Sequence, residues 1–122
     1  MGGLISWYAL CEYPEVFGRA ICLSTHWPGT SHLRYPAVPA AFQRYLSQKL
    51  PSPAHHKIFF AHGTGYLDSL YGPHQKKVDA IMKKKGYVFG KNWKTIVYEG
   101  AEHNETEWHK QMKGALEFVL PE

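Results

Sequence analysis

The stretch MGGLISWYALCEYPEVFGRAICLSTHWPG (residues 1–29) decides the fold. Its apolar residues recur at helical spacing over residues 3–13, and Tyr13-Pro14 predicts the end of that helix. The run RAICLS (residues 19–24) is continuous and apolar, which is typical of a strand covered on both faces. A loop rich in proline and glycine follows over residues 25–36. A helix leading into a buried strand favours an α/β arrangement.

The same alternation continues through the rest of the chain. The pattern predicts helices at residues 39–50, from Pro73 to Gly86, and at residues 105–120, and strands at KIFFA (57–61) and WKTIVY (93–98). Strands that alternate with helices of this length imply parallel pairing. We therefore expect one α/β domain over residues 1–122, with about three parallel strands alternating with four helices.

Composition excludes several classes of protein. With 44% hydrophobic and 15% aromatic residues, the chain is too apolar to be disordered. The formal charge of +4 comes partly from Lys76-Lys77 and Lys83-Lys84-Lys85, which we expect on the solvated face of one helix. Nucleic-acid binding would need a larger basic patch with aromatic residues interleaved, so we expect no nucleic-acid partner. No apolar run approaches the roughly 18 residues of a membrane span, and we expect no membrane partner.

The cysteines and histidines give no metal or disulfide pattern. Two cysteines, Cys11 and Cys22, are too few for a disulfide framework, and we expect buried, reduced thiols. The eight histidines include no H-x-x-x-H pair and no Cys₂His₂ spacing. A histidine-rich metal-binding module stays open as a third interpretation, which the metal content of the purified protein would test. The first interpretation needs no metal and no cofactor.

Polar residues that suit catalysis follow each predicted strand. Ser24-Thr25-His26-Trp27 follows the first strand, HGTGYLD (residues 62–68) the second, and GAEHN (residues 100–104) the third. Ligands of open α/β sheets bind at the carboxyl ends of the strands, so these loops are the candidate site. An acid on one loop and a histidine on the next match the chain order nucleophile, acid, base.

The start of the chain resembles the second half of a nucleophile elbow, the tight strand-to-helix turn G-x-S-x-G. Small residues must follow the nucleophile because a β-carbon would collide with the strand, and Gly2 and Gly3 fit that need. Together with GTGYLDSLYGPHQKKVDAIMKKKGY and GAEHNETEWHKQMKGALEFVL, the first stretch resembles the C-terminal half of esterases of the α/β-hydrolase superfamily. That group includes enterochelin-esterase-like and esterase-D-like proteins, and the resemblance covers nearly the whole chain.

The resemblance implies residue roles. Asp68 matches the triad acid, His103 the general base, and Met1 the residue whose backbone N–H donates to the oxyanion hole. His26 and Trp27 are candidates for the substrate pocket. His62 departs from the acidic or aromatic residue more usual at that position, which puts the surroundings of Asp68 in question.

Simpler interpretations of these residues remain open. Asp68 could satisfy backbone N–H groups in a turn, and His103 could be a loop histidine near a helix cap. His26 and Trp27 could be ordinary packing residues of their loop. No serine of the chain fits the nucleophile, because Ser6 lies one turn into a helix and Ser24 ends a strand without a glycine elbow.

The position of the serine suggests a fragment. In the family pattern G-x-S-M-G-G the serine falls just before Met1, so we expect part of a serine-dependent ester hydrolase that is inactive alone. Its substrate would be a small-molecule ester, and a cytoplasmic location is favoured. Without the neighbouring strand, an apolar sheet edge would stay open and promote self-association. The alternative is a non-catalytic remnant that binds a protein partner through that edge.

Overall fold

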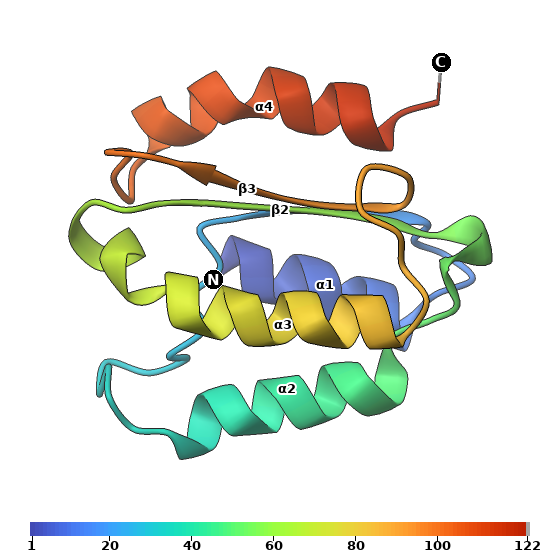
Figure 1. Cartoon of the computed structure of the whole chain (residues 1–122), viewed down its shortest axis with the longest axis horizontal. Helices are drawn as coiled ribbons and strands as arrows, with labels where there is room; N and C mark the ends of the chain where they lie inside the picture. The colour runs from blue at the N-terminus through green and yellow to red at the C-terminus, as the bar shows by residue number, and fades with distance from the viewer. Residues whose placement is uncertain (122) are drawn as a thin grey trace.

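The computed structural model describes residues 1–121 and contains one parallel sheet with four α-helices (Figure 1). The strands are β1 (Arg19–Leu23), β2 (Lys57–Gly63) and β3 (Trp93–Tyr98), in the order β1-β2-β3. The helices are α1 (Gly2–Glu12), α2 (Ala37–Lys49), α3 (Gly72–Lys84) and α4 (Glu105–Val119). The expected α/β class, with three parallel strands and four helices, is confirmed.

The helices lie on both faces of the sheet. Helix α4 covers one face, α1 and α3 lie against the other, and α2 forms an outer layer beyond them (Figure 1). Alternate residues of β2 point to opposite faces, so Ile58 and Phe60 enter the larger core while Phe59 and Ala61 enter the smaller core beneath α4. Because β2 is covered on both faces, most of its sequence is a continuous run of apolar residues.

The second strand is longer than its sequence predicts. The predicted strand ends at Ala61, but His62 and Gly63 pair with Val97 and Tyr98 of β3 and extend β2 by two residues. A short 3₁₀ helix, Tyr66–Leu70, replaces the open loop expected after it. Asp68 therefore sits in a hydrogen-bonded turn close to the end of the strand.

Strand β1 lies at the edge of the sheet, as expected. Two adjoining cavities run along it, of about 330 and 280 Å³, and both are lined by Ile21 and Ser6. The first cavity lies at the carboxyl end of β1 and the second at its amino end. The open edge of the sheet is therefore a groove rather than a flat surface.

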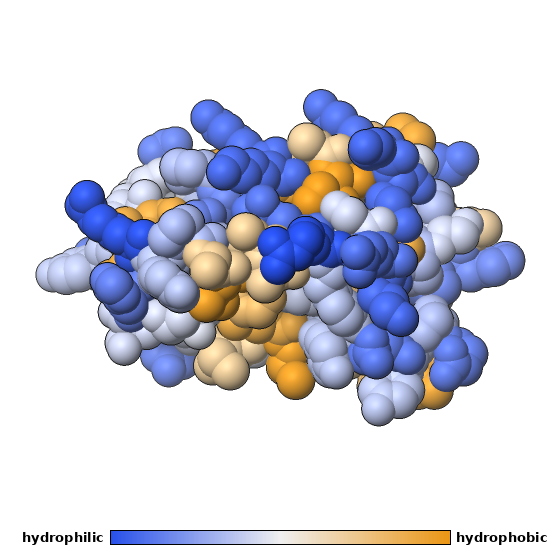
Figure 2. All heavy atoms as spheres, turned by 90° about the horizontal axis from the view of Figure 1, so that it is seen from below, coloured by the Kyte–Doolittle hydropathy of each residue, from blue (hydrophilic) through white to orange (hydrophobic). Residues whose placement is uncertain are grey.

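The surface and the thiols agree with the sequence pattern. Lys76, Lys77, Lys83 and Lys84 are exposed, and Figure 2, which views the α2 side, shows hydrophilic side chains around a hydrophobic centre. Cys11 and Cys22 are free and buried, and burial raises the pKa of the Cys11 thiol to about 12. Within residues 1–121, no helix combines the length and the apolar character needed to cross a membrane.

Candidate active site

The polar residues singled out in the sequence meet at the carboxyl end of the sheet. Ser24 follows β1, Asp68 lies in the turn after β2, and His103 lies in the loop between β3 and α4. Parallel strands bring these three connections to one edge, although the chain separates them by up to 79 residues between positions 24 and 103. The topology is what assembles the site.

Asp68 and His103 form a direct pair. The Nδ1 atom of His103 lies 2.9 Å from Oδ1 of Asp68, whose side chain is fully buried. An ionised carboxylate only accepts hydrogen bonds, so Nδ1 of His103 carries the proton. In the neutral ring, Nε2 is then unprotonated and free to accept a proton. This is the tautomer that a general base needs.

Two further donors hold the other oxygen of Asp68. The Ser24 hydroxyl donates to Oδ2 at 2.6 Å, and the backbone N–H of Gly63 donates to it at 2.7 Å. The backbones of Gly63 and Ala101 approach each other closely, so a β-carbon on Gly63 would collide with the carbonyl oxygen of Ala101. Both oxygens of the buried Asp68 carboxylate therefore have hydrogen-bond donors within the protein.

A second chain of hydrogen bonds reaches His103 from the loop after β1. Nε2 of His26 lies 3.1 Å from the carbonyl oxygen of Thr30, which can only accept, so Nε2 carries a proton. Nδ1 of the neutral His26 ring then accepts from the Tyr71 hydroxyl at 2.8 Å. The Tyr71 oxygen also lies 3.5 Å from Nδ1 of His103. Burial and the nearby charge of Asp68 raise the pKa of Tyr71, which keeps its hydroxyl protonated.

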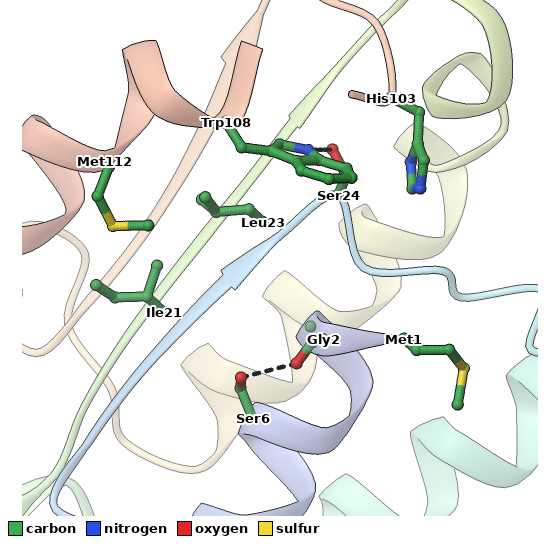
Figure 3. Close-up of a pocket in the computed structure, with 10 residues that line it drawn as sticks. Met1, Gly2, Ser6, Ile21, Leu23, Ser24, His103, Trp108 and Met112 are labelled. Atoms are coloured by element: carbon green, nitrogen blue, oxygen red, sulfur yellow. Dashed lines mark hydrogen bonds between the residues drawn. The ribbon is translucent and has the colours of Figure 1, made fainter. Parts of the chain in front are cut away.

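His103 opens onto the larger of the two cavities along β1 (Figure 3). Ile21 and Leu23 of β1 and Trp108 and Met112 of α4 supply most of its apolar wall. The start of α1 supplies the opposite wall with Met1, Gly2, Gly3 and Ser6. The free nitrogen of the base is therefore next to an apolar cavity large enough for a small organic ligand.

The first turn of α1 packs tightly against the loop after β1. A β-carbon on Gly3 would collide with the side chain and backbone of Thr25, so glycine is required there. Met1 is 80% exposed and lines the cavity that His103 faces. Met1 is thus next to the candidate base, and its role in an oxyanion hole stays a prediction.

The two candidates for the substrate pocket lie elsewhere. Trp27 is buried in the larger core, where it stacks on Trp7 and donates to Gln75 at 2.9 Å. His26 is half-buried against Tyr71. Neither residue lines the cavity next to His103, and a contact of either with substrate stays a prediction. His62 is buried at the end of β2, with Nδ1 facing the carbonyl oxygen of Gly63 at 2.7 Å.

Sequence reasoning placed Ser24 in a candidate loop but missed its contact with Asp68, and it missed Tyr71 and Trp108 altogether. Tyr71 and Trp108 carry no local motif. Their one sequence signal is position, because each lies close to the end of a strand or the start of a helix at the sheet's carboxyl edge.

Metal ligands do not gather in the described structure. Among residues 1–121, no group of three or more His, Cys, Asp or Glu side chains is placed to hold a metal ion. The titratable groups of the site bond to one another instead.

Comparison with known proteins adds no assignment. No family model, no curated protein and no solved structure matched the chain significantly.

Proposed function

We propose that this chain carries the acid and the base of a Ser-Asp-His site that hydrolyses small-molecule esters. The single observation behind the proposal is the 2.9 Å contact between Asp68 and His103, with Nε2 of His103 free beside an apolar cavity. The chain order and the loops that carry the pair fit the resemblance to α/β-hydrolase esterases.

In this reaction Nε2 of His103 takes the proton of a serine hydroxyl as the serine oxygen attacks the ester carbonyl carbon. The imidazolium then gives that proton to the departing alcohol, which leaves an acyl-enzyme. In a second round His103 takes a proton from water as the water oxygen attacks the acyl carbon. His103 then returns that proton to the serine oxygen as the serine–acyl bond breaks, which releases the carboxylic acid. Asp68 takes no proton in this reaction. Its role is to fix the tautomer of His103 and to stabilise the imidazolium. No step calls for a cofactor.

The nucleophile in this proposal comes from outside residues 1–121. Two serines line the cavity, but the Ser6 hydroxyl donates to the carbonyl oxygen of Gly2 at 2.7 Å and the Ser24 hydroxyl donates to Asp68. Neither hydroxyl is paired with His103. A serine held next to Met1 and Gly2 would face the same cavity as Nε2 of His103, which matches the elbow-like start of α1.

Hydrolysis of p-nitrophenyl acetate tests the proposal. The chain alone should be inactive, and a chain extended at its amino end by a strand and a G-x-Ser turn directly ahead of Met1 should be active. In the extended protein, His103→Ala and Asp68→Asn should each lower turnover by about 10⁴-fold or more. An inactive extended protein would refute the esterase function. Activity of the chain alone that disappears with His103→Ala would refute an outside nucleophile.

The groove along β1 favours a second candidate function, binding of a protein strand. An edge strand offers unpaired backbone N–H and C=O groups, and here it is flanked by apolar side chains of α1 and α4. The same edge can pair with a second copy of the chain. We therefore expect the isolated chain to form oligomers or aggregates.

Light scattering after size-exclusion chromatography measures this association. Ile21→Lys places a charge in both cavities and should shift the chain toward monomer, whereas Lys76→Ala on the exposed face of α3 should leave association unchanged. A monomeric wild-type chain with a cooperative melt would contradict the expected self-association through the edge of β1.

A further inference from the structure

Ser24 has an unusual backbone for a serine at the end of a strand. Its φ is +47°, in the left-handed region that residues other than glycine rarely adopt. The residue is only 2% exposed. Strained backbone of this kind persists where surrounding contacts impose it, and it is concentrated at functional sites. The Ser24 hydroxyl makes two hydrogen bonds at this position.

The direction of each hydrogen bond at Ser24 follows from chemistry. The indole Nε1–H of Trp108 can only donate, and it lies 2.8 Å from Oγ of Ser24. Oγ therefore accepts from Trp108, and its own proton points to Oδ2 of Asp68 at 2.6 Å. The indole thus directs the serine proton at the carboxylate.

We propose that Ser24 is a positioning residue that locks the carboxylate of Asp68 for its bond to His103, with Trp108 directing the Ser24 hydroxyl. This inference deepens the proposed function and rests on it. Ser24 and Gly63 occupy Oδ2, so Oδ1 is the oxygen left for His103. Without the serine hydroxyl, one backbone N–H alone holds Oδ2, and the carboxylate gains freedom to rotate.

Trp108 links the acid and the base. Its ring packs edge-to-face on the His103 ring, with centroids 5.0 Å apart and planes at 86°. The same side chain forms part of the cavity wall (Figure 3). A residue of α4 therefore contacts the base directly and reaches the acid through Ser24, and it also borders the space where we place the substrate.

The test measures the Nδ1 proton of His103 by NMR in the ¹⁵N-histidine-labelled chain. In the wild type this proton should resonate at low field and exchange slowly with water. Ser24→Ala and Ser24→Gly should move it upfield and speed its exchange about tenfold, the effect of losing one typical hydrogen bond. Trp108→Phe keeps an aromatic ring but removes the donor, so it should cause a smaller change in the same direction.

Matched variants separate this inference from the proposed function. Ser6→Ala removes a hydroxyl from the same cavity without touching Asp68, and it should leave the proton unchanged. Ser24→Gly accepts the positive φ without strain, so its fold is safe and its melting temperature checks this. A wild-type chain without a low-field proton, or one unaffected by Asp68→Asn, would refute the Asp68–His103 pair. A proton lost in Asp68→Asn but unchanged in both Ser24 variants would refute the role of Ser24.

Discussion

The charged residues at the two ends of the sheet differ in their exposure and in their hydrogen-bond partners. At the amino end, Nε of Arg19 donates to the carbonyl oxygen of Val119 at 2.7 Å, and Nζ of Lys57 donates to that of Phe118 at 3.3 Å. These cations stabilise the C-terminal end of α4 and keep contact with water. At the carboxyl end, the buried carboxylate of Asp68 accepts from the buried Ser24 hydroxyl and from the partly exposed ring of His103.

Burying the Asp68 carboxylate costs free energy that the exposed cations at the other end do not. A carboxylate withdrawn from water is costly unless donors surround it, and Asp68 has three of them. A helix end could be stabilised by exposed cations alone, as it is at the amino end. An acid hydrogen-bonded to a histidine beside a cavity is the geometry expected of a functional site.

The largest expected effect is at the acid. Asp68→Ala leaves the Ser24 hydroxyl, the Gly63 N–H and the His103 Nδ1–H without their acceptor, and should lower the free energy of unfolding by about 3 to 5 kcal/mol. Lys57→Ala at the opposite end should cost less than about 1 kcal/mol. Urea denaturation followed by circular dichroism measures both. Equal losses at the two ends would remove the contrast between them.

A smaller effect is expected where two backbones meet at the carboxyl end. Gly63→Ala would push a methyl group into the carbonyl oxygen of Ala101 and should cost about 2 to 3 kcal/mol. The matched control is Gly114→Ala on the exposed side of α4, where nothing lies within 4 Å of the new β-carbon. That change should stabilise the chain by about 0.5 to 1 kcal/mol in thermal unfolding, because alanine suits a helix. If the Gly63 variant were as stable as wild type, the close approach would not constrain the site.

The smallest effect compares two buried tyrosine hydroxyls. Tyr71→Phe leaves Nδ1 of His26 without a donor, and Tyr87→Phe leaves the carbonyl oxygen of Pro51 without one. Each should cost about 1 kcal/mol. Only Tyr71→Phe should shift the ¹⁵N resonances of His26, which histidine-labelled NMR spectra would detect. Unchanged His26 resonances in that variant would contradict the hydrogen-bond direction assigned from Thr30.

Much of the fold follows from local sequence pattern. The strand at residues 93–98 has the predicted bounds, and the helix from Glu105 ends one residue earlier than predicted. Strand β2 extends past its apolar run because pairing with β3 recruits His62 and Gly63. Hydropathy alone does not report such pairing.

The site was only partly predictable. Chain order and loop position single out Asp68 and His103, and the structure brings their side chains into contact. Trp27 shows the limit, because its place in a loop beside His26 suggested a pocket while its ring is buried against Trp7. Ser24 and Trp108 are 84 residues apart in the sequence, and no local pattern predicts a hydrogen bond between residues so far apart.

The register of the sheet also sets the order in which the molecule can be assembled. Arg19 of β1 pairs with Lys57 of β2, 38 residues along the chain, and Ile58 of β2 pairs with Trp93 of β3, 35 residues along the chain. Closing loops of this length slows folding compared with local helix formation. His103 lies beyond β3, so its pair with Asp68 forms only after all three described strands have been synthesised. The low-field proton of His103 would then be a late marker of complete folding.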